Sequence, residues 1–133
     1  MHAPKTTAEL VRAYYRAYET KDRDSIASLL SEDFRFSSPL DDHIDRATYF
    51  AKCWPNSQRI RAFRIERLFE RGDEAFARYT LEPENGAGFR NTEFFTIAAG
   101  KITEVEVYFG YSGGTVGENN DEWVARTRGA DPA

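Results

Sequence analysis

The residues with the clearest chemical potential are Tyr14, the adjacent pair Asp42 and His43, and Glu93. A carboxylate beside an imidazole holds one tautomer of the ring and tunes its basicity, so Asp42 and His43 form a candidate proton-transfer pair. Glu93 lies in a segment rich in aromatic rings. If its side chain points inward, burial raises the pKa of the carboxyl, which then acts as an acid or a hydrogen-bond donor. Tyr14 can hold or polarise a ligand oxygen.

Tyr14 and Glu93 also have purely structural interpretations. Tyr14 can be a core residue whose hydroxyl bonds another buried group. Glu93 can face solvent, or it can pair with Arg78 or Arg90 on a neighbouring strand. The sequence leaves these alternatives open.

The loop residues Asp41, Asp42 and His43 and the single cysteine, Cys53, have structural alternatives as well. Loop aspartates usually form turns or cap helices. Asp42, His43 and Glu93 lack the spacing that is diagnostic of a metal site, so no metal is predicted. One cysteine excludes an internal disulfide and a cysteine-based zinc site, and we interpret Cys53 as a buried structural thiol.

Helices are predicted in the first half of the chain, where apolar residues recur every three or four positions. Thr6 and Glu9 form a capping box in front of the first helix, and Asp22 is the expected N-cap of a second. Asp45 is expected to cap a third helix that runs to Trp54. The apolar stripe of the first helix consists of Leu10, Val11, Tyr14, Tyr15 and Tyr18.

Alternation with a period of two predicts strands in most of the remaining chain. A short strand contains Phe34 and Phe36 and ends at Pro39, and residues Leu40 to Ile44 are expected to form a loop. Four further antiparallel strands are predicted around Phe63–Phe69, Ala75–Leu81, Asn91–Ile97 and Ile102–Phe109.

This order of elements predicts an α+β fold, in which a curved, cone-shaped antiparallel sheet packs against three N-terminal helices. The concave side of such a sheet favours a ligand cavity. With 133 residues and 15.2 kDa, the chain is expected to form a single domain. Its core spans about residues 7–110, and residues 111–133 are expected to be a mobile tail.

Charge and composition argue against several classes of partner. The net charge of −4 and the pI of about 5.3 disfavour nucleic acids and anionic membranes. Neither an apolar run of membrane-spanning length nor the apolar region of a secretion signal is evident, so we expect a cytoplasmic protein. A glycine-rich phosphate loop and a dinucleotide-binding fingerprint are also missing, and no cofactor is predicted.

Two groups of residues form a recognisable family pattern, namely Tyr14, Asp22, Ile26, Leu29, Asp33 and Pro39, and the turn Gly100–Lys101–Ile102. On these residues the chain resembles the SnoaL-like and ketosteroid isomerase-like branch of the nuclear transport factor 2-like superfamily over about residues 7–109. The resemblance implies the cone-shaped fold and a homodimer formed through the large sheet. Isomerases, cyclases, hydrolases, dehydratases and non-catalytic binders share this scaffold, so the fold alone does not fix the function.

Within this resemblance, Tyr14 falls on the tyrosine that ketosteroid isomerases use as an oxyanion donor. Their second donor is a protonated carboxylic acid. Glu93 aligns with this second donor if the alignment shifts by one residue at the turn before Gly100. Without that shift, Thr92 aligns with it. The general base of the family, an aspartate directly before a proline, is Ser38 here. A serine cannot accept a proton near neutral pH without a neighbouring base, so steroid isomerisation by the family mechanism is not expected.

Two functions remain open. In the first, an isomerase, dehydratase or cyclase acts on a small hydrophobic or aromatic molecule. Tyr14 and a protonated Glu93 hold its oxygen, and His43 with Asp42 moves a proton. In the second, the fold is a non-catalytic ligand-binding or dimerisation module, which the serine before Pro39 favours. The residues expected to contact the ligand are Tyr18, Phe34, Phe36, Ser38, Phe50, Cys53, Trp54, Tyr79, Phe95, Val107 and Phe109.

Overall fold

A computed structural model describes residues 5–110, so the expected C-terminal tail lies outside the described residues. Three α-helices, a short 3-10 helix and six strands follow one another along this part of the chain. They are α1 (Thr7–Thr20), α2 (Arg23–Leu29), β1 (Leu30–Ser38), β2 (Asp41–Asp45), α3 (Arg46–Lys52), η1 (Trp54–Arg59), β3 (Ile60–Arg71), β4 (Glu74–Pro83), β5 (Phe89–Ala98) and β6 (Lys101–Phe109).

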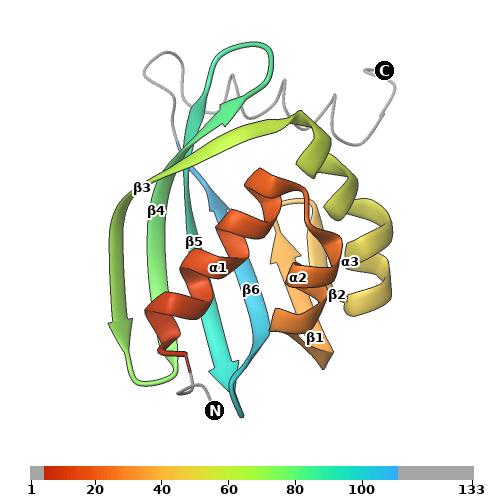
Figure 1. Ribbon diagram of the computed structural model, residues 1–133, viewed down its shortest axis with the longest axis vertical. Coiled ribbons are helices and arrows are strands. Elements are labelled where there is room, and N and C mark those ends of the chain that lie inside the picture. Colours follow the sequence, from red (N-terminus) through yellow and green to blue (C-terminus); the bar gives the residue numbers. More distant parts are fainter. Residues whose placement is uncertain (1–4, 111–133) are drawn as a thin grey trace.

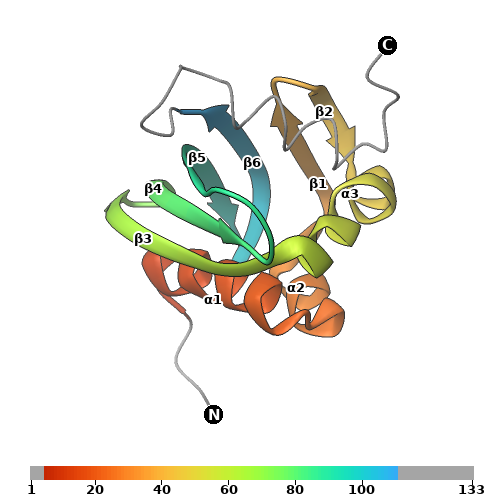
Figure 2. The same ribbon diagram turned by 90° about the horizontal axis from the view of Figure 1, so that it is seen from above.

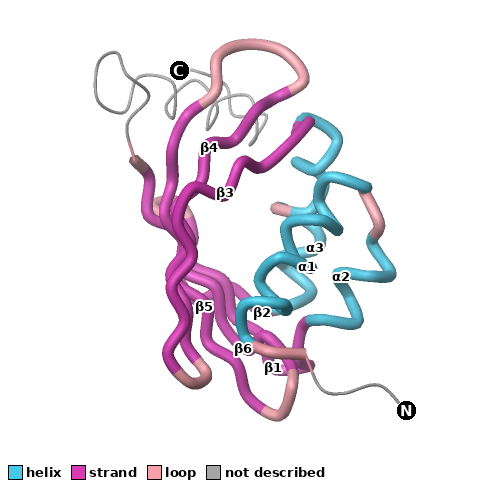
Figure 3. The backbone as a smooth tube through the Cα atoms, turned by 60° about the vertical axis from the view of Figure 1, so that its left-hand side comes forward, coloured by secondary structure: helices cyan, strands magenta, loops and turns pink. Residues whose placement is uncertain are grey.

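The strands form one sheet in the order β2-β1-β6-β5-β4-β3. The sheet is strongly curved (Figure 2), and the three α-helices lie on the same side of it (Figures 1 and 3). This arrangement confirms the predicted α+β fold. The sheet is mixed, however, because β1 runs parallel to β6 while all other neighbours are antiparallel. A parallel pair requires a crossover connection, and β2, α3 and the three long strands that follow supply it.

The predicted helix caps are present in the structure. Thr6 accepts a hydrogen bond from the backbone of Glu9, and the Glu9 carboxylate accepts one from the backbone of Thr6. Asp22 and Asp45 cap α2 and α3, where their side chains accept hydrogen bonds from the backbone of Ser25 and Thr48. The longest of these helices is α1, and no helix among residues 5–110 combines the length and hydropathy that a membrane crossing requires.

The segment Leu40 to Ile44 was expected to be a loop, and this prediction is wrong for most of its length. Residues Asp41–Asp45 form the edge strand β2, which pairs with β1 through Phe36 and Ile44. The alternation of apolar and polar residues is invisible here because Ile44 is the only apolar residue of the strand. An edge strand of this kind is specified by pairing with its neighbour and not by burial of one face.

The inner face of the sheet and the helices share an aromatic core. Phe95 and Tyr15 are almost fully buried, and their rings meet edge to face. Alternate residues of β5 are buried while those between them are half-buried, which is the pattern of a sheet with a core on one side. The register of β5 therefore determines which side chains reach the interior.

Candidate functional site

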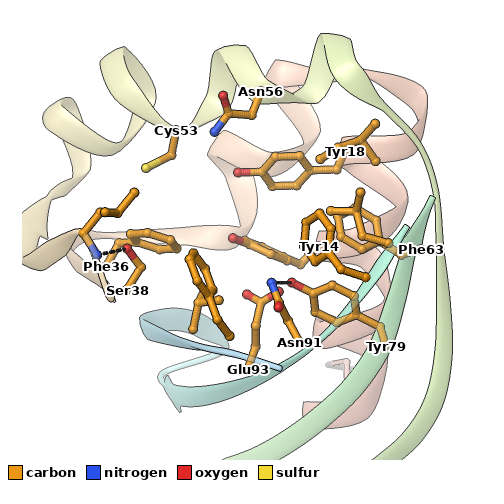
Figure 4. Close-up of a pocket in the computed structure, with 16 residues that line it drawn as sticks. Tyr14, Tyr18, Phe36, Ser38, Cys53, Asn56, Phe63, Tyr79, Asn91 and Glu93 are labelled. Atoms are coloured by element: carbon orange, nitrogen blue, oxygen red, sulfur yellow. Dashed lines mark hydrogen bonds between the residues drawn. The ribbon is translucent and has the colours of Figure 1, made fainter. Parts of the chain in front are cut away.

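A cavity of about 100 Å³ lies between the concave face of the sheet and α1. Figure 4 shows the hydroxyls of Tyr14 and Tyr18 and the carboxyl of Glu93 pointing into the same space. The other expected ligand contacts that line this cavity are Phe36, Ser38, Cys53, Tyr79, Val107 and Phe109.

Some residues expected at the ligand site lie behind the cavity wall. Phe95 packs against the Tyr14 ring, with the ring centroids 5.3 Å apart, and Phe34 packs against Tyr49 at 5.1 Å. These rings support the wall without lining it. The expected contacts that the structure places in the surrounding core are Phe34, Phe50, Trp54 and Phe95.

Several lining residues were not predicted from the sequence. Phe63, Leu81 and Asn91 lie on strands that were predicted, and each falls on the same face as an expected residue. Strand alternation therefore contained the signal for this group. The full set of unpredicted lining residues is Leu40, Asn56, Ile60, Phe63, Leu81, Phe89 and Asn91.

Glu93 is a buried acid in the wall of the cavity, with only 4% of its surface exposed. The Tyr15 hydroxyl donates to Glu93 Oε1 at 3.2 Å, and the Tyr79 hydroxyl forms a second hydrogen bond to the carboxyl. Burial raises the pKa of Glu93 to about 7, although both hydrogen bonds act in the opposite direction. Close to neutral pH, the carboxyl is therefore present in both protonation states.

Arg78 and Arg90, the alternative partners considered for Glu93, lie on the other face of the sheet. Arg78 and Arg90 contact the carboxylate of Glu66, at 3.4 and 3.2 Å. Side chains alternate between the two faces of a strand, so Glu93 faces the interior while Arg90 and Thr92 do not. The inward orientation of Glu93 is thus the one that the structure adopts.

Three tyrosine hydroxyls form a hydrogen-bonded row next to Glu93, which we call the tyrosine triad (Tyr14, Tyr49 and Tyr18). The hydroxyl of Tyr49 lies between the other two and is 2.8 Å from that of Tyr14. The three hydroxyls carry three hydrogens, and the two hydrogen bonds of the row use two of them. One hydroxyl hydrogen is therefore not used within the row. When the bonds run in one direction along the row, that hydrogen belongs to Tyr14 or Tyr18, and both residues line the cavity.

The tyrosine triad stays neutral at physiological pH. Burial is the largest cause that raises the pKa of Tyr14 well above its usual value, and the same holds for Tyr49. A neutral phenol in an apolar cavity is a hydrogen-bond donor of fixed position and not a base. The triad can therefore hold a ligand oxygen, while Glu93 can exchange a proton.

Asp42 and His43 do not reach this cavity. Their side chains are 96% and 60% exposed on the edge strand β2, where His43 Nδ1 lies 2.6 Å from Asp42 Oδ1. The hydrogen bond with Asp42 is the main cause that raises the pKa of His43. The two residues are paired as expected, but the structure separates them from Tyr14 and Glu93.

Ser38, at the position of the missing base, lines the cavity but has its hydroxyl engaged elsewhere. It donates to Asp41 Oδ2 at 2.9 Å and accepts from the backbone of Leu40 at 3.1 Å. Asp41 itself is not among the residues that line the cavity. Glu93 is the one carboxyl among the described residues of the cavity wall.

A family model described as a SnoaL-like domain matches residues 11–105 of the chain. No curated protein sequence gives a match. Among solved structures, an NTF2-like protein of unknown function from Cytophaga hutchinsonii is 23% identical with a TM-score of 0.68, and the alignment covers 82% of this chain and 94% of that one.

Two further solved structures with this fold have functional descriptions. An LEH-like epoxide hydrolase from M. tuberculosis is 21% identical, with a TM-score of 0.65 and coverage of 77% of this chain and 81% of that one. A candidate polyketide cyclase from Pseudomonas putida is 25% identical, with a TM-score of 0.65 and coverage of 80% and 92%. The two descriptions differ in chemistry, so the shared fold does not select a reaction.

Proposed function

This chain belongs to the SnoaL-like domain family, and from that premise we propose that its cavity binds a small, largely apolar molecule and catalyses proton transfer on it. The ligand carries a carbonyl or hydroxyl oxygen, which the tyrosine triad holds. The observation that supports the proposal is the placement of the buried Glu93 carboxyl and the Tyr14 hydroxyl on one aromatic cavity.

The proposed chemistry assigns different roles to Glu93 and Tyr14. In its ionised form, Glu93 removes a proton from a ligand carbon next to a carbonyl group. Negative charge then develops on the carbonyl oxygen, where the hydroxyl of Tyr14 donates a hydrogen bond. Glu93 returns the proton to another ligand atom, which makes the overall reaction an isomerisation or an elimination. Glu93 thereby replaces the pair Asp42 and His43 as the proton carrier.

The cavity wall also restricts the charge and size of the ligand. Among the described residues of this wall, none is a lysine, arginine or histidine. An anionic group would therefore be buried near Glu93 without a counter-charge, which is strongly unfavourable. Ligand sites usually enclose roughly 300–1,000 Å³. A cavity of about 100 Å³ can enclose only the reactive end of a ligand, and the rest lies towards the mouth.

The ligand charge can be tested with pairs of compounds that differ in one group. Small cyclic ketones should bind at pH 8, whereas analogues of the same size in which a carboxylate replaces the carbonyl should bind at least about tenfold more weakly. Binding is measured by chemical-shift changes of the cavity amides in NMR spectra. Equal binding of ketone and carboxylate would contradict the proposed polarity of the site.

Catalysis itself can be tested without knowledge of the natural substrate. A base that removes a proton next to a carbonyl also exchanges that proton with solvent, so a bound ketone in D₂O should take up deuterium at that carbon. The exchange should be much slower with the Glu93→Gln variant. Ketone binding without any catalysed exchange would refute proton transfer and leave a binding protein.

A non-catalytic binding module is the second candidate function. Ser38 occupies the position of the family base, and its hydroxyl hydrogen is directed to Asp41 and not to the cavity. In this alternative, Glu93 serves only as a hydrogen-bond acceptor for Tyr15 and Tyr79. The deuterium experiment separates the two candidates because both bind the ketone but only the enzyme exchanges its proton.

We also propose that the chain forms a homodimer through the outer face of the sheet. Phe69 on β3 and Phe76 on β4 are exposed to 69% and 48%, and the Phe76 ring packs against that of Phe94 on β5. Exposed aromatic groups of this kind often mark an interface. Light scattering should give a mass of about twice 15.2 kDa, and Phe76→Lys should reduce it to that of one chain. A monomeric wild-type protein would contradict this proposal.

A further inference from the structure

A second group of chemically capable side chains lies on the outer face of the sheet, away from the cavity. It consists of His43 on β2 and of Glu104 and Glu106 on β6, which we call the outer cluster. One ligand atom of each residue lies within 4.8 Å of the others. Glu104 and Glu106 share a face because the residue between them, Val105, is fully buried on the inner side.

The orientation of the His43 ring is fixed by its neighbour. Its Nδ1 lies 2.6 Å from Asp42 Oδ1, so the carboxylate accepts the Nδ1 hydrogen and the lone pair of the neutral ring is left on Nε2. Nε2 lies 3.5 Å from Glu104 Oε2. A carboxylate that orients a histidine from behind is the usual outer-shell arrangement in metal sites.

The basic side chain that contacts the glutamates of the outer cluster is that of His43 itself, through Nε2 and Glu104 Oε2. Among residues 5–110, no lysine or arginine forms an ion pair with Glu104 or Glu106. Arg35 is the register partner of Glu104 on β1, but its guanidinium donates to the backbone carbonyls of Asp33 and Phe34. Two neighbouring carboxylates and an imidazole nitrogen are thus available to a cation.

The outer cluster adjoins a surface depression of about 450 Å³, whose lining includes His43, Glu106, Ser37 and Tyr108. The depression borders the Glu93 cavity, since Ser38, Leu40 and Val107 line both, but neither His43 nor Glu106 contributes to that cavity. It leaves room beside the outer cluster for the water molecules or ligand oxygens that complete the coordination of a cation.

We propose that His43, Glu104 and Glu106 bind one divalent transition-metal ion, with Asp42 as the residue that positions the imidazole. A set of one nitrogen and two carboxylate ligands suits Zn²⁺, Mn²⁺ or Co²⁺ better than Mg²⁺ or Ca²⁺, which prefer oxygen ligands alone. The inference does not rest on the proposed function, because the outer cluster and Glu93 lie on opposite faces of the sheet.

Isothermal titration of the full, tag-free chain with ZnCl₂ tests this inference. We expect one Zn²⁺ per chain, and excess Mg²⁺ should not displace it. His43→Ala, Glu104→Gln and Glu106→Gln should each weaken binding by at least about tenfold, and Asp42→Asn should weaken it by a similar factor or less. Because these side chains are not part of the core, circular dichroism should show that all variants are folded.

Matched controls distinguish the outer cluster from other ligands on the chain. His2→Ala tests the other histidine of the sequence, and Glu74→Gln changes a glutamate on β4. Both should bind Zn²⁺ as the wild type does. Undiminished binding by His43→Ala, loss of binding on His2→Ala, or displacement of Zn²⁺ by Mg²⁺ would each overturn the proposal. The absence of binding to the wild-type chain would overturn it as well.

Discussion

Replacing Glu93 with glutamine should raise the free energy of unfolding by about 3 kcal/mol more at pH 8 than at low pH. The wild-type carboxyl must ionise inside an aromatic core at this pH. Its pKa is about 7 in the folded protein, against 4.5 for an ordinary glutamate. Glutamine keeps an oxygen that accepts from Tyr15 and has no proton to lose. Removing the buried charge therefore removes the penalty.

The pH dependence of this effect follows from the direction of the pKa shift. Between pH 4.5 and about 7, the folded state of the wild type binds more protons than the unfolded state. The free energy of unfolding therefore falls as the pH rises through this window, and the whole penalty is present above it. The Glu93→Gln variant should lack this part of the pH dependence, so the difference between the two stability curves should stop changing with pH below about pH 4.5.

Urea unfolding of both proteins at about pH 5 and pH 8 measures the effect. At each pH, the two proteins differ in their free energy of unfolding. The fixed cost of fitting an amide into the site is the same at both pH values, so the change in this difference with pH reports the ionisation of Glu93 alone. Glu82→Gln is a suitable control, because Glu82 pairs with Arg61 and Arg64 on the outer surface. A Glu93→Gln difference that is the same at both pH values would show that Glu93 ionises as an ordinary glutamate does.

Replacing Tyr14 with phenylalanine should slow the proposed proton transfer by about 10²–10³-fold, with little change in ligand affinity. The hydroxyl donates to an oxygen that gains negative charge only as the proton leaves, so its loss affects the transition state more than the bound ground state. Deuterium uptake by a bound ketone gives the rate, and NMR titration of the same ketone gives the affinity.

Two further tyrosine variants show whether this effect is specific. Tyr49→Phe keeps the hydroxyl of Tyr14 but removes its buried partner, so we expect a smaller loss of rate than for Tyr14→Phe. Tyr108→Phe changes an exposed ring and should leave the rate unchanged. If Tyr14→Phe exchanged deuterium as fast as the wild type, the hydroxyl would have no part in the reaction.

The elements that position the site could be predicted from the sequence because their signals are local. Thr6, Asp22 and Asp45 mark the helix starts through caps that need only neighbouring backbone groups. The alternation through Phe95 and Ile97 favours an inward Glu93 but leaves the outward orientation open, and the structure selects the inward one because all three residues share one face of β5. These patterns together with the family resemblance were enough for the fold class.

Contacts between distant elements could not be predicted in the same way. The position of His43 depends on how the edge strand β2 pairs with β1, including a register shift between Phe36 and Ser38. A shift of one residue moves a side chain to the other face of the sheet. The hydrogen bond between Tyr49 and Tyr14 depends on how α3 packs against α1. The sequence pattern of a helix predicts the helix but not the neighbour against which it packs.

The most direct test of this account is a ¹³C NMR titration of the Glu93 side-chain carboxyl in the wild-type protein, with the Glu93→Gln variant used to assign the signal. The account predicts a midpoint of about 7, because the carboxyl is buried among aromatic rings and tyrosine hydroxyls. A midpoint near 4.5, the value of an ordinary glutamate, would contradict the account, because the carboxyl would then ionise without the penalty that an enclosed aromatic site imposes.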